Sequence, residues 1–190
     1  MKTVAFCGGG SASLHPYYTV SPYEGIVDQL PQDVEVLYQP GVNAYAFTPE
    51  ISAADIRTIT GEPGVRMRLY RGPPSVPNRP VIDKAVLSES SWHLMGFSQP
   101  YLERIFYGDI EGDFVAPVTG SSEVGLAVYG SANLYIDDEL VIENTTVQRG
   151  GNFFFGKGTL EEKVTIVLVK DQVYKLKVEF ISGASRSLVF

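Results

Sequence analysis

The chain has 190 residues, of which 44% are hydrophobic, and it carries a net charge of −7 with a pI near 4.8. This length fits one full domain and part of another, and the apolar fraction is high enough for a packed core. The acidic balance argues against nucleic acid or an anionic membrane as the main partner. No apolar run reaches the ~18 residues that a membrane span needs, so we predict neither partner.

Cysteine and histidine are too scarce for several kinds of site. Cys7 is the only cysteine, so no internal disulfide can form and the redox compartment is not indicated. His15 and His93 are the only histidines, which excludes metal sites of the cysteine/histidine kind. We predict no metal and no cofactor. Residues 1–6 are too short for a signal peptide, and the compartment, secreted or cytoplasmic, stays open.

The first 62 residues have the pattern of an α/β segment. Residues 3–7 predict the end of a buried strand, and residues 34–38 predict a second strand. A helix is expected between them, from Ser21 as its N-cap to about Leu30. Strand, loop, helix and strand make half of a doubly wound sheet, which needs further elements to cover both of its faces. We therefore expect a partial domain here.

The pattern changes near residue 62. From there, short runs of alternating apolar and polar residues are separated by turn residues, as in an antiparallel sandwich. Strands are predicted at residues 65–70, 105–114, 123–129, 132–136, 140–143, 164–169 and 173–180. Two tight hairpins are predicted to close at residues 137–139 and 170–172.

Two stretches resemble known families. Gly8-Gly9-Gly10-Ser11-Ala12-Ser13, followed by Ser21-Pro22-Tyr23-Glu24, resembles the start of the αβα domain of family-three glycoside hydrolase β-glucosidases. Residues 130–141, continued by Phe154-Phe155-Gly156-Lys157-Gly158-Thr159, are similar to the protective-antigen (PA-fourteen) domain, a β-sandwich. Fungal and yeast β-glucosidases of that family carry such a module inserted in the αβα domain, so the order in this chain matches as well.

The resemblance implies a mainly β chain. An antiparallel β-sandwich of protective-antigen type is expected at residues 63–190, preceded by a partial αβα segment at residues 1–62. It also implies part of a retaining β-glucosidase, which hydrolyses terminal β-D-glucosyl residues, with the sandwich shaping the aglycone side of the site. In the family, the catalytic nucleophile lies in a (β/α)8 barrel and the acid/base glutamate lies beyond the insert. We therefore expect a fragment or truncated gene product, inactive without the barrel and the rest of the αβα domain.

The carboxylates of the chain give no catalytic pair. A retaining glycosidase needs two carboxylates about 5–5.5 Å apart. The candidates lie next to one another in predicted turns or alternate along strands: Asp137 and Asp138, Glu161 and Glu162, and Asp109, Glu111 and Asp113. Turn or solvated roles fit them better. Asp137 and Asp138 also resemble the paired aspartates that hold Ca²⁺ in yeast adhesins, but they follow the strand that the adhesin pair precedes, which argues against a calcium site.

The glycine loop ending at Ser11 is the first candidate site. Contiguous glycines could bring backbone N–H groups to a phosphate, but the lysine and spacing of a Walker loop are missing. The family resemblance implies instead that this loop reaches over the bound sugar, with Ser11 near the glycone. A plain strand-to-loop turn is the alternative.

The second candidate is Phe153 in a run of three phenylalanines flanked by glycines. If this segment is extended, Phe153, Phe154 and Phe155 cannot all face one core, because side chains alternate. An exposed aromatic ring offers a platform for the apolar face of a sugar, and burial of all three in a core or between domains is the alternative. The resemblance assigns Phe153 to the aglycone subsite, with glucosides or oligosaccharides as ligands.

Two further observations bear on the whole chain. A free-standing, carbohydrate-binding, lectin-like module is the alternative function, and the α/β segment argues against it, since a lectin needs no such unit.

Trp92 is expected in the core. Asn144-Thr145-Thr146 forms a glycosylation sequon, which matters only if the protein is secreted.

Overall fold

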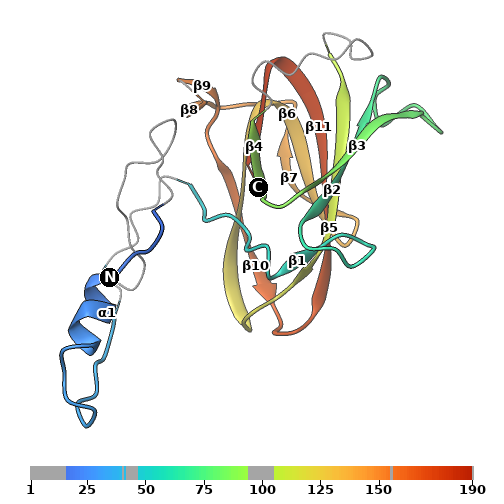
Figure 1. Cartoon of the computed structure of the whole chain (residues 1–190). Helices are drawn as coiled ribbons and strands as arrows, with labels where there is room; N and C mark the ends of the chain where they lie inside the picture. The colour runs from blue at the N-terminus through green and yellow to red at the C-terminus, as the bar shows by residue number, and fades with distance from the viewer. Residues whose placement is uncertain (1–15, 40, 42–46, 94–104, 155, 190) are drawn as a thin grey trace. The chain divides into compact units, whose positions relative to one another are not determined.

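The computed structural model describes residues 16–39, 41, 47–93, 105–154 and 156–189 (Figure 1). Packing divides the chain into two compact units, Met1–Tyr45 and Ala46–Phe190. They are described separately below.

The described part of the first unit contains a short helix, α1 (Pro22–Val27). Its start is the predicted capping box, because the Ser21 hydroxyl accepts a hydrogen bond from the Glu24 N–H at 3.1 Å and the Glu24 carboxylate accepts one from the Ser21 N–H at 2.6 Å. These bonds lower the pKa of Glu24. The helix ends at Val27, three residues before the predicted end.

The two strands predicted for the first unit are not found in its described residues. Residues 34–38 form no strand, and residues 3–7 lie outside the described residues. A strand of a parallel sheet is held by ladder hydrogen bonds to its neighbours, and no neighbouring strand is present among residues 16–39. Ile26 and Leu37 are exposed, as expected for apolar side chains without a second layer to cover them.

Eleven strands lie in the described residues of the second unit, and all of the pairings between them are antiparallel (Figure 1). They are β1 (Ile56–Arg57), β2 (Val65–Tyr70), β3 (Val81–Leu87), β4 (Ser91–His93), β5 (Tyr107–Val115), β6 (Gly120–Ile136), β7 (Glu139–Asn144), β8 (Gly150–Phe154), β9 (Lys157–Thr159), β10 (Glu162–Leu168) and β11 (Val173–Val189).

The long strand β6 connects the two layers of the sandwich. The main strand order is β10-β6-β11-β5-β2-β3. Residues 120–126 of β6 pair with β10, whereas residues 127–136 pair with β11. One strand thus belongs to one sheet at its start and to the other sheet at its end, a known way of turning a corner between packed sheets. The predicted antiparallel β-sandwich is confirmed.

The predicted strands agree with the structure in most places. Strand 65–70 is β2. The separately predicted strands 123–129 and 132–136 are one continuous strand, because Gly130 takes a φ of 139° and still pairs with Ser182 of β11. Strand β3 was not predicted, and its mixed burial pattern explains why, since it is an edge strand without a clear buried face.

The two predicted hairpins differ in outcome. Asp137 and Asp138 have φ values of 50° and 67°, and Ile136 pairs with Glu139, so a two-residue turn joins β6 to β7 as predicted. Residues 170–172 also turn, but the prediction of a hairpin there is wrong. The flanking strands β10 and β11 do not pair with each other, because the chain passes from one sheet to the other at this turn.

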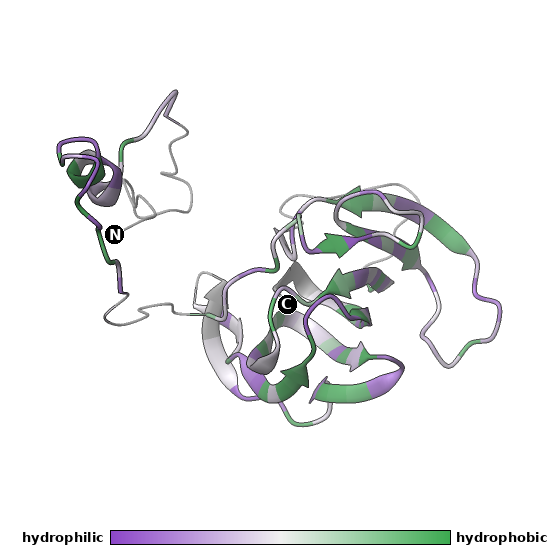
Figure 2. Cartoon of the chain, turned by 90° about the horizontal axis from the view of Figure 1, so that it is seen from below, coloured by the Kyte–Doolittle hydropathy of each residue, from purple (hydrophilic) through white to green (hydrophobic). Residues whose placement is uncertain are grey.

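The core lies between the layers and follows the alternation of the strands. On β2, Val65 and Leu69 are buried, whereas Arg66 points to the outer side. Banding of hydrophilic and hydrophobic residues along the strands is visible in Figure 2. Trp92 packs edge-to-face on Phe180 with ring centroids 5.2 Å apart, which confirms it as a core residue.

Candidate functional site

The two residues predicted to bind substrate are only partly placed by the structure. Ser11 lies outside the described residues. Phe153 lies in β8, whose backbone is described as a strand over Gly150–Phe154. The candidate site is therefore built from the hairpin that carries Phe153.

This hairpin, β8–β9, is a two-stranded sheet of its own beside the sandwich. Gly150 pairs with Thr159 at its base and Phe154 pairs with Lys157 near its tip. Gly156, in the turn, has a φ of 75°, which a residue with a side chain rarely adopts. A short turn thus joins the two strands after this pair. Phe153 lies one position before Phe154, the β8 member of the last ladder pair.

Glycine is also required where the hairpin meets the following chain. A Cβ atom on Gly151 would collide with the backbone of Thr159 and Leu160, whereas a Cβ atom on the neighbouring Gly150 would meet nothing within 4 Å. The Leu160 N–H donates a hydrogen bond to the Arg149 carbonyl at 2.8 Å. The two arms therefore approach each other closely at the base, and Gly151 permits that approach.

A buried polar cluster holds the base of the hairpin to the sandwich. The Thr159 hydroxyl accepts hydrogen bonds from the Val128 N–H and from the Asn144 side-chain amide, each at 3.1 Å. The Gln148 amide donates to the carbonyls of Gly130 and Asn144, at 2.9 and 2.8 Å. Both arms are thereby bonded to the segment around β6.

An ion pair reinforces the same base from the solvent side. The Arg149 guanidinium donates two hydrogen bonds to the Glu162 carboxylate, at 2.8 and 2.7 Å. The hydrogen bond from Arg149 lowers the pKa of Glu162, and the same bond raises the pKa of Arg149. Because the Arg149 side chain is 61% exposed, this pair contributes less to stability than the buried cluster.

A hollow of about 310 Å³ opens at the base of the hairpin. Its lining comes from β6 and from both arms, and includes Tyr129, Gln148, Arg149 and Thr159. A tyrosine ring, an amide and a guanidinium around a small hollow are groups that can contact a sugar by apolar and hydrogen-bonding surfaces.

The carboxylates considered as catalytic candidates are engaged in the structure. Glu161 accepts two hydrogen bonds from the Thr48 N–H, at 2.9 and 3.0 Å, and Asp137 accepts one from the Lys175 N–H at 2.9 Å. Glu162 is paired with Arg149 as described above. Asp137 stabilises the turn to which it belongs, as predicted. The prediction of solvated roles is wrong for Glu161 and Asp109, whose side chains are 5% and 7% exposed. Each is buried because the tertiary structure brings it a partner, the Thr48 N–H for Glu161 and the Arg79 guanidinium for Asp109.

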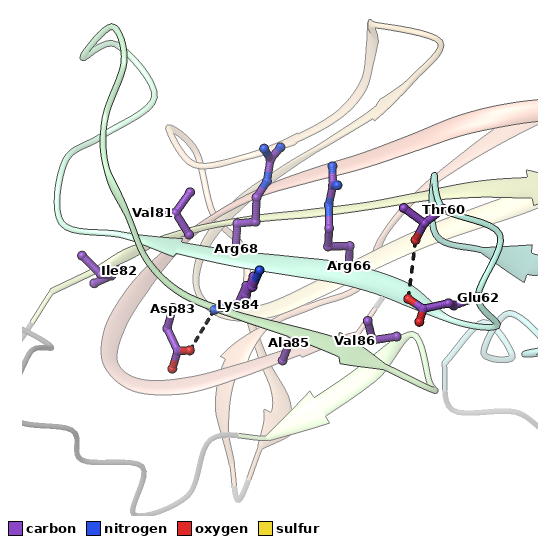
Figure 3. A pocket seen from close by; sticks show the side chains of 10 residues that line it. All are labelled: Thr60, Glu62, Arg66, Arg68, Val81, Ile82, Asp83, Lys84, Ala85 and Val86. Atoms are coloured by element: carbon purple, nitrogen blue, oxygen red, sulfur yellow. Dashed lines mark hydrogen bonds between the residues drawn. The ribbon is translucent and has the colours of Figure 1, made fainter.

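The outer face of the large sheet carries a groove of about 880 Å³. Arg66 and Arg68 rise side by side from β2, opposite the β3 residues that line the groove (Figure 3). Both arginines bind the Glu111 carboxylate, at 2.7 and 2.5 Å. Burial raises the pKa of Glu111, but the hydrogen bonds and charges of the two arginines outweigh it and hold the pKa below its ordinary value. The positive charges of Arg66 and Arg68 are therefore paired within the sheet.

Metal binding and membrane insertion find no structural support in the described part of the chain. Within it, no group of three or more histidine, cysteine, aspartate or glutamate side chains is arranged to hold a metal ion. The helix found in those residues is too short to cross a membrane.

Sequence reasoning missed the buried cluster because its residues indicated other roles. Asn144 appeared as the acceptor of a glycosylation sequon, yet its side chain is fully buried and its amide nitrogen is bonded to Thr159. An asparagine in this setting does not carry a glycan in the folded protein. The signal available in the sequence was its place two residues after Ile142, which puts both side chains on the same face when the predicted strand 140–143 is extended by one residue, as it is in β7.

Comparison with known proteins shows that the chain is similar to one domain family and to fungal proteins named β-glucosidases. The sequence profile of the PA14 domain matches residues 61–189. A protein named "Probable beta-glucosidase K" from Emericella nidulans is 62% identical over 189 residues, which cover 100% of this chain and 23% of that protein. A second protein of that name, from Aspergillus fumigatus, is 61% identical over the same length and is covered to 25%.

A solved structure agrees over nearly the whole chain. The β-glucosidase from Kluyveromyces marxianus in complex with glucose is 30% identical, with a TM-score of 0.77 over 95% of this chain and 23% of that chain. The chain thus spans about a quarter of the length of the proteins that it matches.

Proposed function

The chain belongs to the PA14 domain family, which its β-sandwich represents over residues 61–189, and from this we propose that it is the PA14-bearing part of a retaining β-glucosidase. The observation that carries the proposal is the 62% identity to one β-glucosidase over the whole chain. That likeness includes the residues before the PA14 domain, which a free-standing sugar-binding module would not need.

The domain assignment follows from the same likeness. We assign residues 1–62 to the αβα domain of the enzyme and residues 63–190 to the sandwich inserted in it. Residues 46–62 already pack in one unit with the sandwich, and β1 pairs with β5. This stretch therefore connects the two domains while being held to the second one.

The proposed role of the sandwich is to shape the aglycone side of the sugar site. Phe153, on the β8–β9 hairpin, forms an apolar wall for the aglycone, and Ser11 lies near the glycone. The proposal is supported by the separate, anchored hairpin. Glucosides or oligosaccharides are the substrates, and the (β/α)8 barrel with the rest of the αβα domain supplies the catalytic carboxylates.

The test uses a host enzyme, defined as the Emericella nidulans relative with its matching segment replaced by these 190 residues. In this enzyme, Phe153→Ala should change the ratio of kcat/KM between longer β-linked glucose oligosaccharides and a small aryl glucoside by about tenfold, the effect of one lost apolar contact in a subsite. Lys157→Ala, on the other arm of the same hairpin, is the matched control. An unchanged ratio in the Phe153 variant would refute the role of this residue.

The isolated chain provides a second test. Without the barrel, the 190 residues should hydrolyse no aryl glucoside above the buffer background, because the two required carboxylates are supplied from elsewhere. Hydrolysis by the purified isolated chain would contradict the proposed division of roles.

A further inference from the structure

The orientation of the β8–β9 hairpin depends on contacts outside its own ladder. A two-stranded hairpin is marginally stable by itself, and among the described residues no backbone ladder joins this one to a strand of the sandwich. Side chains at its base must therefore determine where its tip lies. The buried cluster around Thr159 is the group placed to do so.

Thr159 is the hub of this cluster on the arm that leaves the hairpin. Its hydroxyl oxygen accepts two hydrogen bonds, from the Val128 N–H of β6 and from the Asn144 amide of β7, each at 3.1 Å. The residue is 4% exposed. Since the Val128 N–H donates to this hydroxyl, the end of β9 is bonded directly to the centre of β6.

Asn144 links the same hub to the arm that enters the hairpin. Its carbonyl and its side-chain oxygen accept hydrogen bonds from Gln148, at 2.8 and 3.3 Å, and its amide also reaches the Leu126 carbonyl at 3.4 Å. Gln148 in turn donates to the Gly130 carbonyl. Both arms are thus attached to β6 between residues 126 and 130, where that strand passes from one sheet to the other.

We propose that Thr159, together with Asn144, is a positioning residue for aglycone selection, holding the β8–β9 hairpin so that its tip faces the substrate. This inference rests on the proposed function of Phe153. Thr159 is 4% exposed and Asn144 is 0% exposed, so we assign them no direct contact with substrate. They act by fixing the base of the hairpin, and they do not change the catalytic carboxylates of the enzyme.

The test compares Thr159→Val with Thr159→Ser in the host enzyme. Valine keeps the shape of threonine and loses the hydroxyl, which leaves the Val128 N–H unpaired and removes one of the two acceptors of the Asn144 amide. Serine keeps the hydroxyl. We expect the valine variant to shift the ratio of kcat/KM between oligosaccharide and aryl glucoside in the direction of Phe153→Ala, by about tenfold or less. The serine variant should keep the original ratio.

A double-mutant cycle separates the possible failures. If Thr159 acts through the hairpin tip, Thr159→Val should add nothing to the ratio once Phe153 is alanine. If Phe153→Ala alone has no effect, the proposed function of Phe153 fails. If Phe153→Ala has its effect but Thr159→Val leaves the ratio unchanged, or lowers kcat/KM equally for both substrates, the positioning role is refuted.

Amide hydrogen exchange on the 190-residue chain gives a readout independent of activity. The Val128 amide and the amides of residues 157–159 should exchange faster in Thr159→Val than in Thr159→Ser, while amides in the centre of β5 keep their protection. Equal exchange of these amides in the two variants would overturn the inference.

Discussion

Arg79 and Asp109 form a buried ion pair across 30 residues of sequence, with the Arg79 Nη2 atom 2.5 and 2.6 Å from the two carboxylate oxygens. The Arg79 guanidinium also lies over the Tyr70 ring, 3.9 Å from its centroid. Asp109 belongs to β5, whereas Arg79 lies in the proline-rich connection between β2 and β3. The pair therefore fastens a long loop to the middle of the large sheet.

Removing one partner of this pair should destabilise the sandwich strongly. The side chains of Arg79 and Asp109 are 10% and 7% exposed, so Asp109→Ala leaves a buried, uncompensated guanidinium. We expect the free energy of unfolding to fall by about 3–5 kcal/mol, measured by urea denaturation of the 190-residue chain. Glu123→Ala, which breaks the exposed pair with Lys163, should lower the free energy of unfolding far less. Equal losses in the two variants would contradict the structure.

The Glu111 carboxylate should make stability depend on pH in the acid range. Its pKa in the folded chain lies below the ordinary value of 4.5 because Arg66 and Arg68 outweigh the effect of burial. The unfolded chain therefore binds a proton at Glu111 at higher pH than the folded chain does. The stabilisation is fully present above pH 4.5 and is lost as the pH falls through the lowered pKa. The urea midpoint measured between neutral pH and pH 3 should show this loss.

Two variants check the assignment of that pH dependence. Glu111→Gln should flatten the acid limb of the stability profile, because the titrating group is gone. Arg68→Gln should reduce its slope, because one of the two cations that lower the pKa is removed. If the acid limb keeps its slope in Glu111→Gln, other carboxylates cause it.

Adjacent glycines at the base of the hairpin should respond differently to alanine. A Cβ atom on Gly151 would collide with backbone atoms of Thr159 and Leu160, which cannot move aside as a side chain can. Gly151→Ala should therefore open the base and cost about 1–3 kcal/mol, with faster amide exchange at residues 157–159. Gly150→Ala meets open space and serves as the control. The close approach of the two arms is disproved if both variants show wild-type exchange.

The structural features predicted correctly from sequence are those whose partners lie close along the chain. Ser21 and Glu24 complete their capping box within three residues, and Asp137 with Asp138 closes a two-residue turn. The turn at residues 170–172 shows the limit of this reasoning. A turn is a local property, but whether the strands on either side pair with each other depends on the layers of the whole sandwich.

The sequence by itself predicted the β-sandwich and its long strands, because alternation and turn residues act over a few positions and define which side chains need burial. The resemblance of two of its motifs to known proteins indicated the family. The positions of the charged and polar groups were decided only by the tertiary structure. Arg79 finds Asp109, and Thr159 finds Val128, across about 30 residues. Asn144 lies in a glycosylation sequon in the sequence, but in the structure it is buried and its side chain is hydrogen-bonded to Thr159. A polar side chain away from water must take the partner that folding brings to it, and no local pattern names that partner.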